Sequence, residues 1–230
     1  MTEIFKVIAN STLEVFDANN NIVSYAFVLT FANKKDKDTI RPFLIVNKSV
    51  VEKYDFLYVK FNATDNTEIK EHRISFSKNL IPIFQLNNCD ILALPLAQTL
   101  NELDKNKIQI KLNDFPADLI PDQKKIAELN EVNLFTWFSF DKTINSKICH
   151  QNNNVTLLDN DLNLFFKSDE AVIGAPVFII NVGAFSSNDG VCFGTRVNFM
   201  GCFEYISGQY AKLRSGIDLV KGIKEKFHFD

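Results

Sequence analysis

Short, strand-like runs recur along almost the whole chain and constrain its fold more than any other feature. The runs are rich in Val, Ile, Phe and Tyr, and clusters of Asn, Asp and Lys separate them, as in β-strands joined by polar turns. The first half contains Ile4–Ala9, Val23–Phe31, Pro42–Val46, Phe56–Asn62, Glu68–Phe76 and Asp90–Leu96. The second half continues with Val132–Phe140, Val155–Leu158, Leu162–Phe166, Pro176–Asn181 and Val197–Ile206. Because short loops rather than regular helices join them, the pattern excludes a doubly wound α/β sheet.

Three segments have helical rather than strand periodicity. Leu96–Leu103 and Asp122–Glu131 occupy the middle of the chain, and Pro121 suits the first turn of the second segment. Ile217–Phe227 has the spacing of an amphipathic helix. We therefore predict a mainly β protein with two groups of about six strands, arranged as two packed antiparallel barrels or a large sandwich. A helical connector separates the groups, and a helix closes the chain.

Composition excludes several classes of function. The chain has 25 Lys+Arg against 28 Asp+Glu, a net charge of -3, which argues against a nucleic-acid partner because such proteins need a basic face. There are 8 glycines in 230 residues, and neither phosphate-binding glycine motif occurs, which disfavours nucleotide binding. No apolar run reaches the roughly 20 residues of a membrane span, and the first residues lack the layout of a signal peptide. We expect a cytoplasmic protein with no cofactor and no membrane contact.

The cysteines do not form a metal-binding pattern. Cys89, Cys149, Cys192 and Cys202 include no C-x-x-C pair, and no histidine lies at zinc-finger spacing from them. Cys89 and Cys202 lie in apolar runs, where a thiol behaves as a small hydrophobic group. The sequence therefore predicts no metal site.

Several stretches carry a more specific signal. Pro42–Val51 is similar to a strand ending in T-N-K-H-V-V, Cys89–Leu96 to a D-[IL]-x-x-L-P-[IL] run, and Gly174–Phe178 to G-[SG]-P-V-F. Two further stretches fit the same family pattern: Leu119–Pro121 is similar to its connector between the barrels, and Gly194–Gly201 to its substrate-side strand. In this order the chain resembles the trypsin-like serine peptidases, in particular bacterial domains of that family. The resemblance implies one domain over residues 1–230: two packed six-stranded barrels, about 1–100 and 131–230, and a connector over about 101–130.

The same resemblance places the catalytic positions of the family on residues that cannot perform its chemistry. The histidine position falls on Ser49, the aspartate on Asp90 and the nucleophile on Ile173, or on Ala175 if the register shifts by two. Ala171 replaces a glycine of the oxyanion hole. A serine is no general base and a hydrocarbon cannot attack a carbonyl group. The resemblance thus implies a catalytically inactive pseudopeptidase, in which Asp90 is an inward carboxylate that accepts hydrogen bonds from the backbone or from Ser49.

No other side chain is placed by the sequence to restore catalysis. His72 lies in a polar strand, His150 in an Asn-rich loop and His228 at the C-terminal end, and we expect all three at the surface. Cys192 and Cys202 could be thiol nucleophiles in principle, but a reactive thiolate needs a cationic or basic neighbour. We therefore expect no catalytic residue.

A trypsin-like fold without its triad would keep a groove whose edge strand pairs with an extended peptide. The resemblance places that edge in Phe203–Gly208, with Tyr205, Ile206 and Gly208 as candidate binding residues. We expect a module that binds a protein or peptide, or regulates an active partner, in a multi-component bacterial system. Two alternatives stay open: a hydrolase with substituted catalytic residues, and a structural subunit whose β edges assemble with copies of itself.

Overall fold

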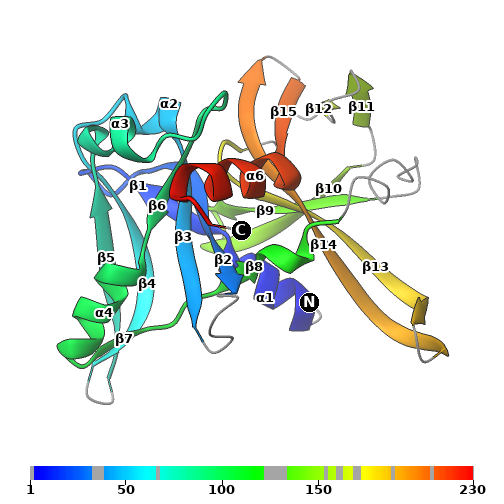
Figure 1. Ribbon diagram of the computed structural model, residues 1–230, viewed down its shortest axis with the longest axis horizontal. Helices are drawn as coiled ribbons and strands as arrows, with labels where there is room; N and C mark the ends of the chain where they lie inside the picture. The colour runs from blue at the N-terminus through cyan, green and yellow to red at the C-terminus, as the bar shows by residue number, and fades with distance from the viewer. Residues whose placement is uncertain are drawn as a thin grey trace.

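Two antiparallel β-sheets lie side by side, and the C-terminal helix crosses the front of the molecule between them (Figure 1). The computed structural model describes residues 3–32, 39–65, 68–121, 134–152, 155–158, 163–167, 172–187, 190–207 and 210–229. One sheet curls into a half-barrel and the other is open. The mainly β character is therefore confirmed, whereas two closed six-stranded barrels are not.

The N-terminal sheet has the strand order β5-β4-β1-β2-β3-β6. Its strands are β1 (Leu13–Phe16), β2 (Ile22–Ala32), β3 (Ile40–Asn47), β4 (Leu57–Asp65), β5 (Glu68–Phe76) and β6 (Ile91–Pro95). Two short strands extend it: β7 (Ile108–Ile110) pairs with β4, and β8 (Asp114–Pro116) pairs in parallel with β2. Successive side chains of β2 point to opposite faces, so Phe27 and Leu29 enter one hydrophobic core while Ala26 and Val28 enter another.

The C-terminal sheet has the order β10-β9-β13-β14-β15-β12-β11. Its strands are β9 (Phe135–Asp141), β10 (Ser146–Asn152), β11 (Val155–Leu158), β12 (Asn163–Lys167), β13 (Pro176–Ser187), β14 (Gly190–Ser207) and β15 (Tyr210–Ser215). Within this sheet, β13 and β14 form a long hairpin whose far end extends away from the rest of the molecule (Figure 1).

The helices lie at the ends of strands or across the sheets. They are α1 (Glu3–Ser11), α2 (Lys48–Val51), α3 (Ile81–Phe84), α4 (Ala97–Lys105) and α6 (Gly216–Phe227), with 3₁₀ turns η1 (Lys78–Leu80) and η2 (Ala117–Leu119). The predicted helices at Leu96–Leu103 and Ile217–Phe227 are confirmed as α4 and α6. In α6 the Ser215 hydroxyl caps the N-terminus by accepting a hydrogen bond from the Asp218 N–H at 3.1 Å.

One predicted strand is wrong and several elements were missed. Ile4–Ala9 lies in helix α1 rather than in a strand, because Ile4, Phe5 and Ile8 fall on one helical face that packs on the core. The sequence did not predict strands β1, β7, β8, β10 and β15, or the short helices α2 and α3. The predicted helix Asp122–Glu131 lies outside the described residues.

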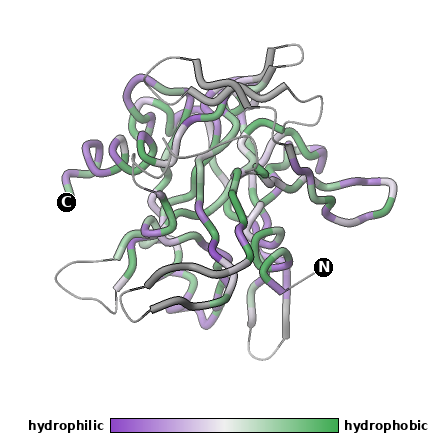
Figure 2. The backbone as a smooth tube through the Cα atoms, turned by 90° about the vertical axis from the view of Figure 1, so that its right-hand side faces the viewer, coloured by the Kyte–Doolittle hydropathy of each residue, from purple (hydrophilic) through white to green (hydrophobic). Residues whose placement is uncertain are grey.

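Phenylalanine rings from both sheets form one shared core. The rings of Phe27 and Phe199 lie 5.2 Å apart, and those of Phe115 and Phe178 lie 4.7 Å apart. Hydrophobic stretches run through the central strands in Figure 2, and hydrophilic ones lie mostly in the outer turns. The phenylalanines of this core, which come from both sheets, therefore help to join the two halves. Within the described ranges, no helix has the length and apolar character needed to cross a membrane.

Candidate functional site

The predicted histidine and aspartate positions lie next to each other. Ser49 is in α2, directly after β3, and Asp90 directly precedes β6, the strand that pairs with β3. The Ser49 N–H donates to Asp90 Oδ1 at 2.9 Å, and the Lys48 N–H donates to the Asp90 carbonyl oxygen at 2.9 Å. Asp90 thus satisfies the first two N–H groups of α2 in place of a local cap. The expected acceptance of a backbone hydrogen bond by Asp90 is confirmed.

The predicted nucleophile position lies on a sharp corner that touches this region. The Ile173 carbonyl oxygen accepts the Tyr25 N–H at 2.9 Å, and the Gly174 N–H donates to the Phe203 carbonyl oxygen at 2.8 Å. Gly174 has φ +83°, and a Cβ built on it would lie 1.9 Å from the Tyr25 oxygen and 3.0 Å from Asn47 Oδ1. The corner therefore lies against Asn47, two residues before Ser49.

Side chains around the corner are hydrophobic or buried. The Ile173 side chain packs against the core of the N-terminal sheet, and Ala175, the alternative nucleophile position, is fully buried. Asn47 Oδ1 is also buried and has no hydrogen-bond donor in the part of the chain that the structure describes. Ala171 lies outside that part.

An ion pair between Glu204 and Arg214 links Asp90 to the C-terminal sheet. Glu204, on β14, is 5% exposed, and its Oε1 accepts the Asp90 N–H at 2.7 Å. Arg214, on β15, donates from Nη2 to both Glu204 oxygens at 3.0 and 2.9 Å. Burial lowers the pKa of Arg214, but the hydrogen bond and charge of Glu204 outweigh it and raise that pKa. Sequence reasoning missed this pair, although a single acidic residue inside an apolar run (C-F-E-Y-I) was a usable signal.

An apolar groove of about 440 Å³ opens beside Ile173. Its walls come from the start of β2, the end of β9 and the corner: Ile22, Val23, Tyr25, Phe140, Val172 and Ile173. The Tyr25 hydroxyl accepts the Phe140 N–H at 2.9 Å, and burial raises the pKa of Tyr25. Lys142 also lines the groove and is exposed.

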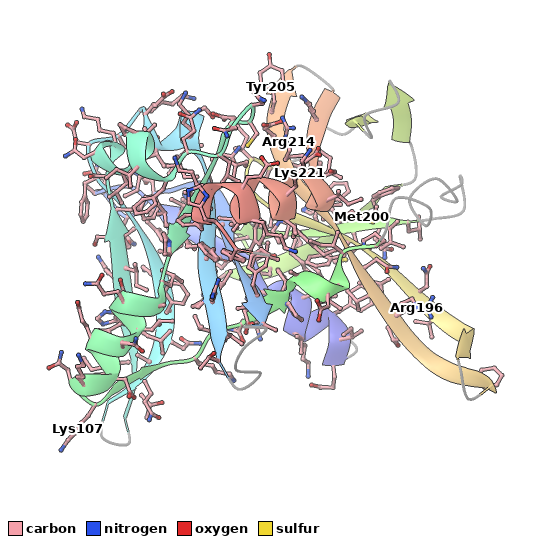
Figure 3. All side chains as sticks on the ribbon, in the orientation of Figure 1. Lys107, Arg196, Met200, Tyr205, Arg214 and Lys221 are labelled. Atoms are coloured by element: carbon pink, nitrogen blue, oxygen red, sulfur yellow. The ribbon has the colours of Figure 1, made fainter. Side chains whose placement is uncertain are left out.

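The predicted peptide-binding residues are only partly described. Tyr205 is 57% exposed and points outward at the upper end of β14, above Arg214 (Figure 3). The pairing of β13 with β14 starts at Pro176 and Cys202, so beyond Phe203 this edge of β14 meets no further strand within the described residues. The Ile206 side chain and Gly208 lie outside them.

The expectation of a surface loop for His150 is wrong. His150 lies in β10 and is 8% exposed, because β10 pairs with β9 and turns this residue toward the buried ring of Trp137. His150 Nε2 is 2.7 Å from the Ser139 hydroxyl oxygen. A serine and a histidine at hydrogen-bond distance are a possible nucleophile and base, although Ser139 is also only 8% exposed.

Cys202 is buried and Cys89 is half-buried, as expected for inert thiols, whereas Cys149 is exposed. Burial raises the pKa of Cys89 to about 11, and burial also raises the pKa of Cys202. The Cys192 side chain lies outside the described residues. Among the side chains that the structure describes, no three His, Cys, Asp or Glu residues converge in a way that could hold a metal ion.

A scan against models of known protein families gives no match, and a search of curated proteins gives no relative.

Proposed function

We propose that the chain is a catalytically inactive, trypsin-like pseudopeptidase that binds a protein or an extended peptide. One observation carries the proposal: Ser49 and Asp90 are in contact beside the corner formed by Ile173 and Gly174. The resemblance assigns these positions to the base, the acid and the nucleophile. They are far apart in the sequence, so their convergence at one junction supports a peptidase-like arrangement.

The order of the strands gives separate support. Numbered from one to six along the chain, the N-terminal strands run 5-4-1-2-3-6. With β11 and β12 counted together as the third strand, the C-terminal strands run 2-1-4-5-6-3. Both orders follow the same closed ring, 1-2-3-6-5-4. The N-terminal sheet is open between its strands 5 and 6, and the C-terminal sheet between its strands 2 and 3. Two halves with one ring order are consistent with a pair of related barrels, each left open.

The chemistry at the junction favours loss of catalysis. Acyl transfer needs a nucleophile, and a base to take its proton. Ser49 offers a hydroxyl group where the base would stand, and Ile173 offers a hydrocarbon that packs on the core. Asp90 holds α2 through Oδ1 and holds Glu204 through its N–H. The acid is therefore used to join segments of the fold.

Two features next to the junction suit an extended peptide. The groove beside Ile173 offers apolar walls to a peptide side chain. The Glu204 carbonyl oxygen accepts from Asn47 Nδ2 at 3.1 Å, and beyond it the end of β14 leaves an edge without a strand partner among the described residues, with Tyr205 exposed beside it. Aromatic side chains of this kind frequently anchor protein interfaces.

Labelling tests the loss of catalysis. The purified protein is incubated with a serine-directed fluorophosphonate, with an active serine peptidase as the positive control. We expect no covalent adduct on the intact protein by mass spectrometry. A stoichiometric adduct would refute the inactive state.

A displayed library of random peptides tests the binding role. We expect selection to enrich peptides whose affinity falls about tenfold in Tyr205→Ala, which is about 1.4 kcal/mol of binding energy. Ile144→Ala is the matched control, because Ile144 is 59% exposed and lies in the turn between β9 and β10. Equal affinities for both variants would contradict a role for Tyr205.

The pair of Ser139 and His150 favours a second candidate, a hydrolase with substituted catalytic residues. Their 2.7 Å separation allows His150 to take the hydroxyl proton of Ser139. The same labelling experiment separates the candidates, since an adduct that disappears in Ser139→Ala would identify this serine as the nucleophile.

A further inference from the structure

A second cavity lies in a gap of the N-terminal sheet and shares no residue with the groove beside Ile173. β4 pairs with β1 at Tyr58 and Val59, and with β7 from Ala63 onward. Between these points the ladder is interrupted on this edge: among the described residues no strand pairs with Lys60 and Phe61, and Asn62 meets only Lys111. A cavity of about 290 Å³ occupies the gap.

The backbone of β4 presents hydrogen-bonding groups to this cavity. The Asn62 carbonyl oxygen accepts the Lys111 N–H at 2.9 Å, so the backbone groups of Asn62 face the gap. Alternate residues of a strand direct their N–H and C=O groups to the same side. Lys60 therefore faces the same edge; the ladder next to the Val15–Val59 pair uses its N–H, so its C=O and the Asn62 N–H are left facing the gap.

Charges around the cavity leave one positive charge uncompensated. Lys60 pairs with Glu71 at 3.3 Å, and Lys147, which comes from β10, pairs with Glu14 at 3.2 Å. Lys111 has no carboxylate within ion-pair distance in the described part of the chain. Three lysines against two glutamates favour a ligand that carries a single negative charge.

Three amide side chains add neutral donors and acceptors. Asn10, Asn62 and Asn113 line the cavity, and within the described ranges none of their side chains bonds to another residue. Each amide can donate two hydrogen bonds and accept two. Such a lining suits hydroxyl groups, which also both donate and accept.

We propose that this cavity binds a sugar-sized organic anion with one acidic group and several hydroxyl groups. The cavity volume equals that of about ten water molecules, which leaves room for a monosaccharide and a few waters. Lys111 holds the acidic group, while the asparagine amides hold the hydroxyl groups, together with the Asn62 N–H and the Lys60 C=O of the β4 backbone. This site is independent of the peptide groove, so either can fail without the other.

Calorimetry and amide NMR with gluconate, glucuronate, glucose and inorganic phosphate test the proposal. We expect one or both organic anions to bind with a Kd below about 1 mM, glucose and phosphate to bind at least about tenfold more weakly, and the Lys60 and Asn62 amide signals to shift. Lys111→Glu should weaken binding about tenfold. Asn62→Asp, which adds a negative charge, should act in the same direction.

Lys105→Glu is the matched control, since Lys105 is an exposed lysine at the end of α4 and lies outside the cavity lining. It should bind like the unaltered protein. The proposal is overturned if neither organic anion shifts the two amide signals, if Lys111→Glu and Asn62→Asp leave the affinity unchanged, or if inorganic phosphate binds as tightly as the organic anions.

Discussion

Asp90 connects three segments of the chain through its backbone and one oxygen of its side chain. Its carbonyl oxygen accepts from Lys48, its Oδ1 accepts from Ser49, and its N–H donates to Glu204. Its second carboxylate oxygen has no hydrogen bond to the residues that the structure describes. An imidazole introduced at position 49 would therefore meet an available acceptor.

Ser49→His tests this geometry. Because the carboxylate of Asp90 favours the charged imidazole, we expect the new histidine to have a pKa about one unit above the ordinary value of about 6.5. An NMR titration of the ring protons measures it. In the double variant Ser49→His/Asp90→Asn the increase should disappear, and a pKa that is the same in both variants would contradict the proposed arrangement.

Cys89 should react slowly with alkylating reagents. Burial raises its pKa from 9.0 to about 11, so at pH 8 its thiolate population is about a hundredfold below that of an ordinary thiol, and alkylation slows in proportion. Iodoacetamide labelling followed by mass spectrometry measures the rate. The urea-unfolded protein is the control, and equal rates in the folded and unfolded states would disprove the expectation.

The same thiol makes stability depend on pH. The unfolded thiol loses its proton near pH 9, while the folded one keeps it until about pH 11. Its contribution to the free energy of unfolding is therefore complete below pH 9 and is lost as the pH rises toward 11. In Cys89→Ala, the free energy of unfolding should therefore decrease less between pH 9 and pH 11 than in the unaltered protein.

At the scale of elements, strands that polar clusters separate from their neighbours in the sequence were predicted, and some short strands with few β-branched or aromatic residues were not. Glu68–Phe76 matches β5 at both ends, because polar turns bound it on each side. β10 and β15 were missed, because their sequences S-K-I-C-H-Q-N and Y-A-K-L-R-S contain few β-branched or aromatic residues and owe their conformation to neighbouring strands. Helix α1 was misread because Ile4 and Ile8 suit either structure.

The residues of the candidate site were likewise predicted only in part from the sequence. Family resemblance located Ser49, Asp90 and Ile173, and the structure brings these segments together. It did not locate Glu204 or Arg214, because their pairing depends on how β14 and β15 meet the turn before β6. The acidic residue in C-F-E-Y-I is a local signal, but its partners on β15 and in the turn before β6 are distant in the sequence and have no local pattern.

The corner at Gly174 should not tolerate a side chain. Gly174→Ala would place its Cβ 1.9 Å from the Tyr25 carbonyl oxygen, at a φ of +83° that non-glycine residues rarely adopt. We expect the free energy of unfolding to fall by about 2–4 kcal/mol, measured by urea denaturation. Gly194→Ala is the matched control, since its Cβ would meet no atom within 4 Å, and a similar loss in both variants would contradict the close approach.

At the scale of the whole molecule, contacts between the halves are spread over several places. The phenylalanine core joins both sheets, Tyr25 bonds to Ile173, and Asp90 bonds to Glu204. At a further point, Lys147 Nζ donates to the Ala9 carbonyl oxygen at 2.7 Å, near the end of α1. Each half thus buries apolar and polar groups that it would expose if it separated from the other.

The two halves should therefore unfold together. Trp137 is the chain's 1 tryptophan and lies in the C-terminal sheet, so its fluorescence reports on that half, whereas far-UV circular dichroism reports on both. We expect the two signals to show one coincident transition in urea. Phe199→Ala, which removes a ring that contacts Phe27 and Phe115, should move both signals to lower urea together and cost about 3–5 kcal/mol. If the fluorescence transition moves and part of the dichroism signal stays in place, the halves are separate folding units and the shared core does not couple them.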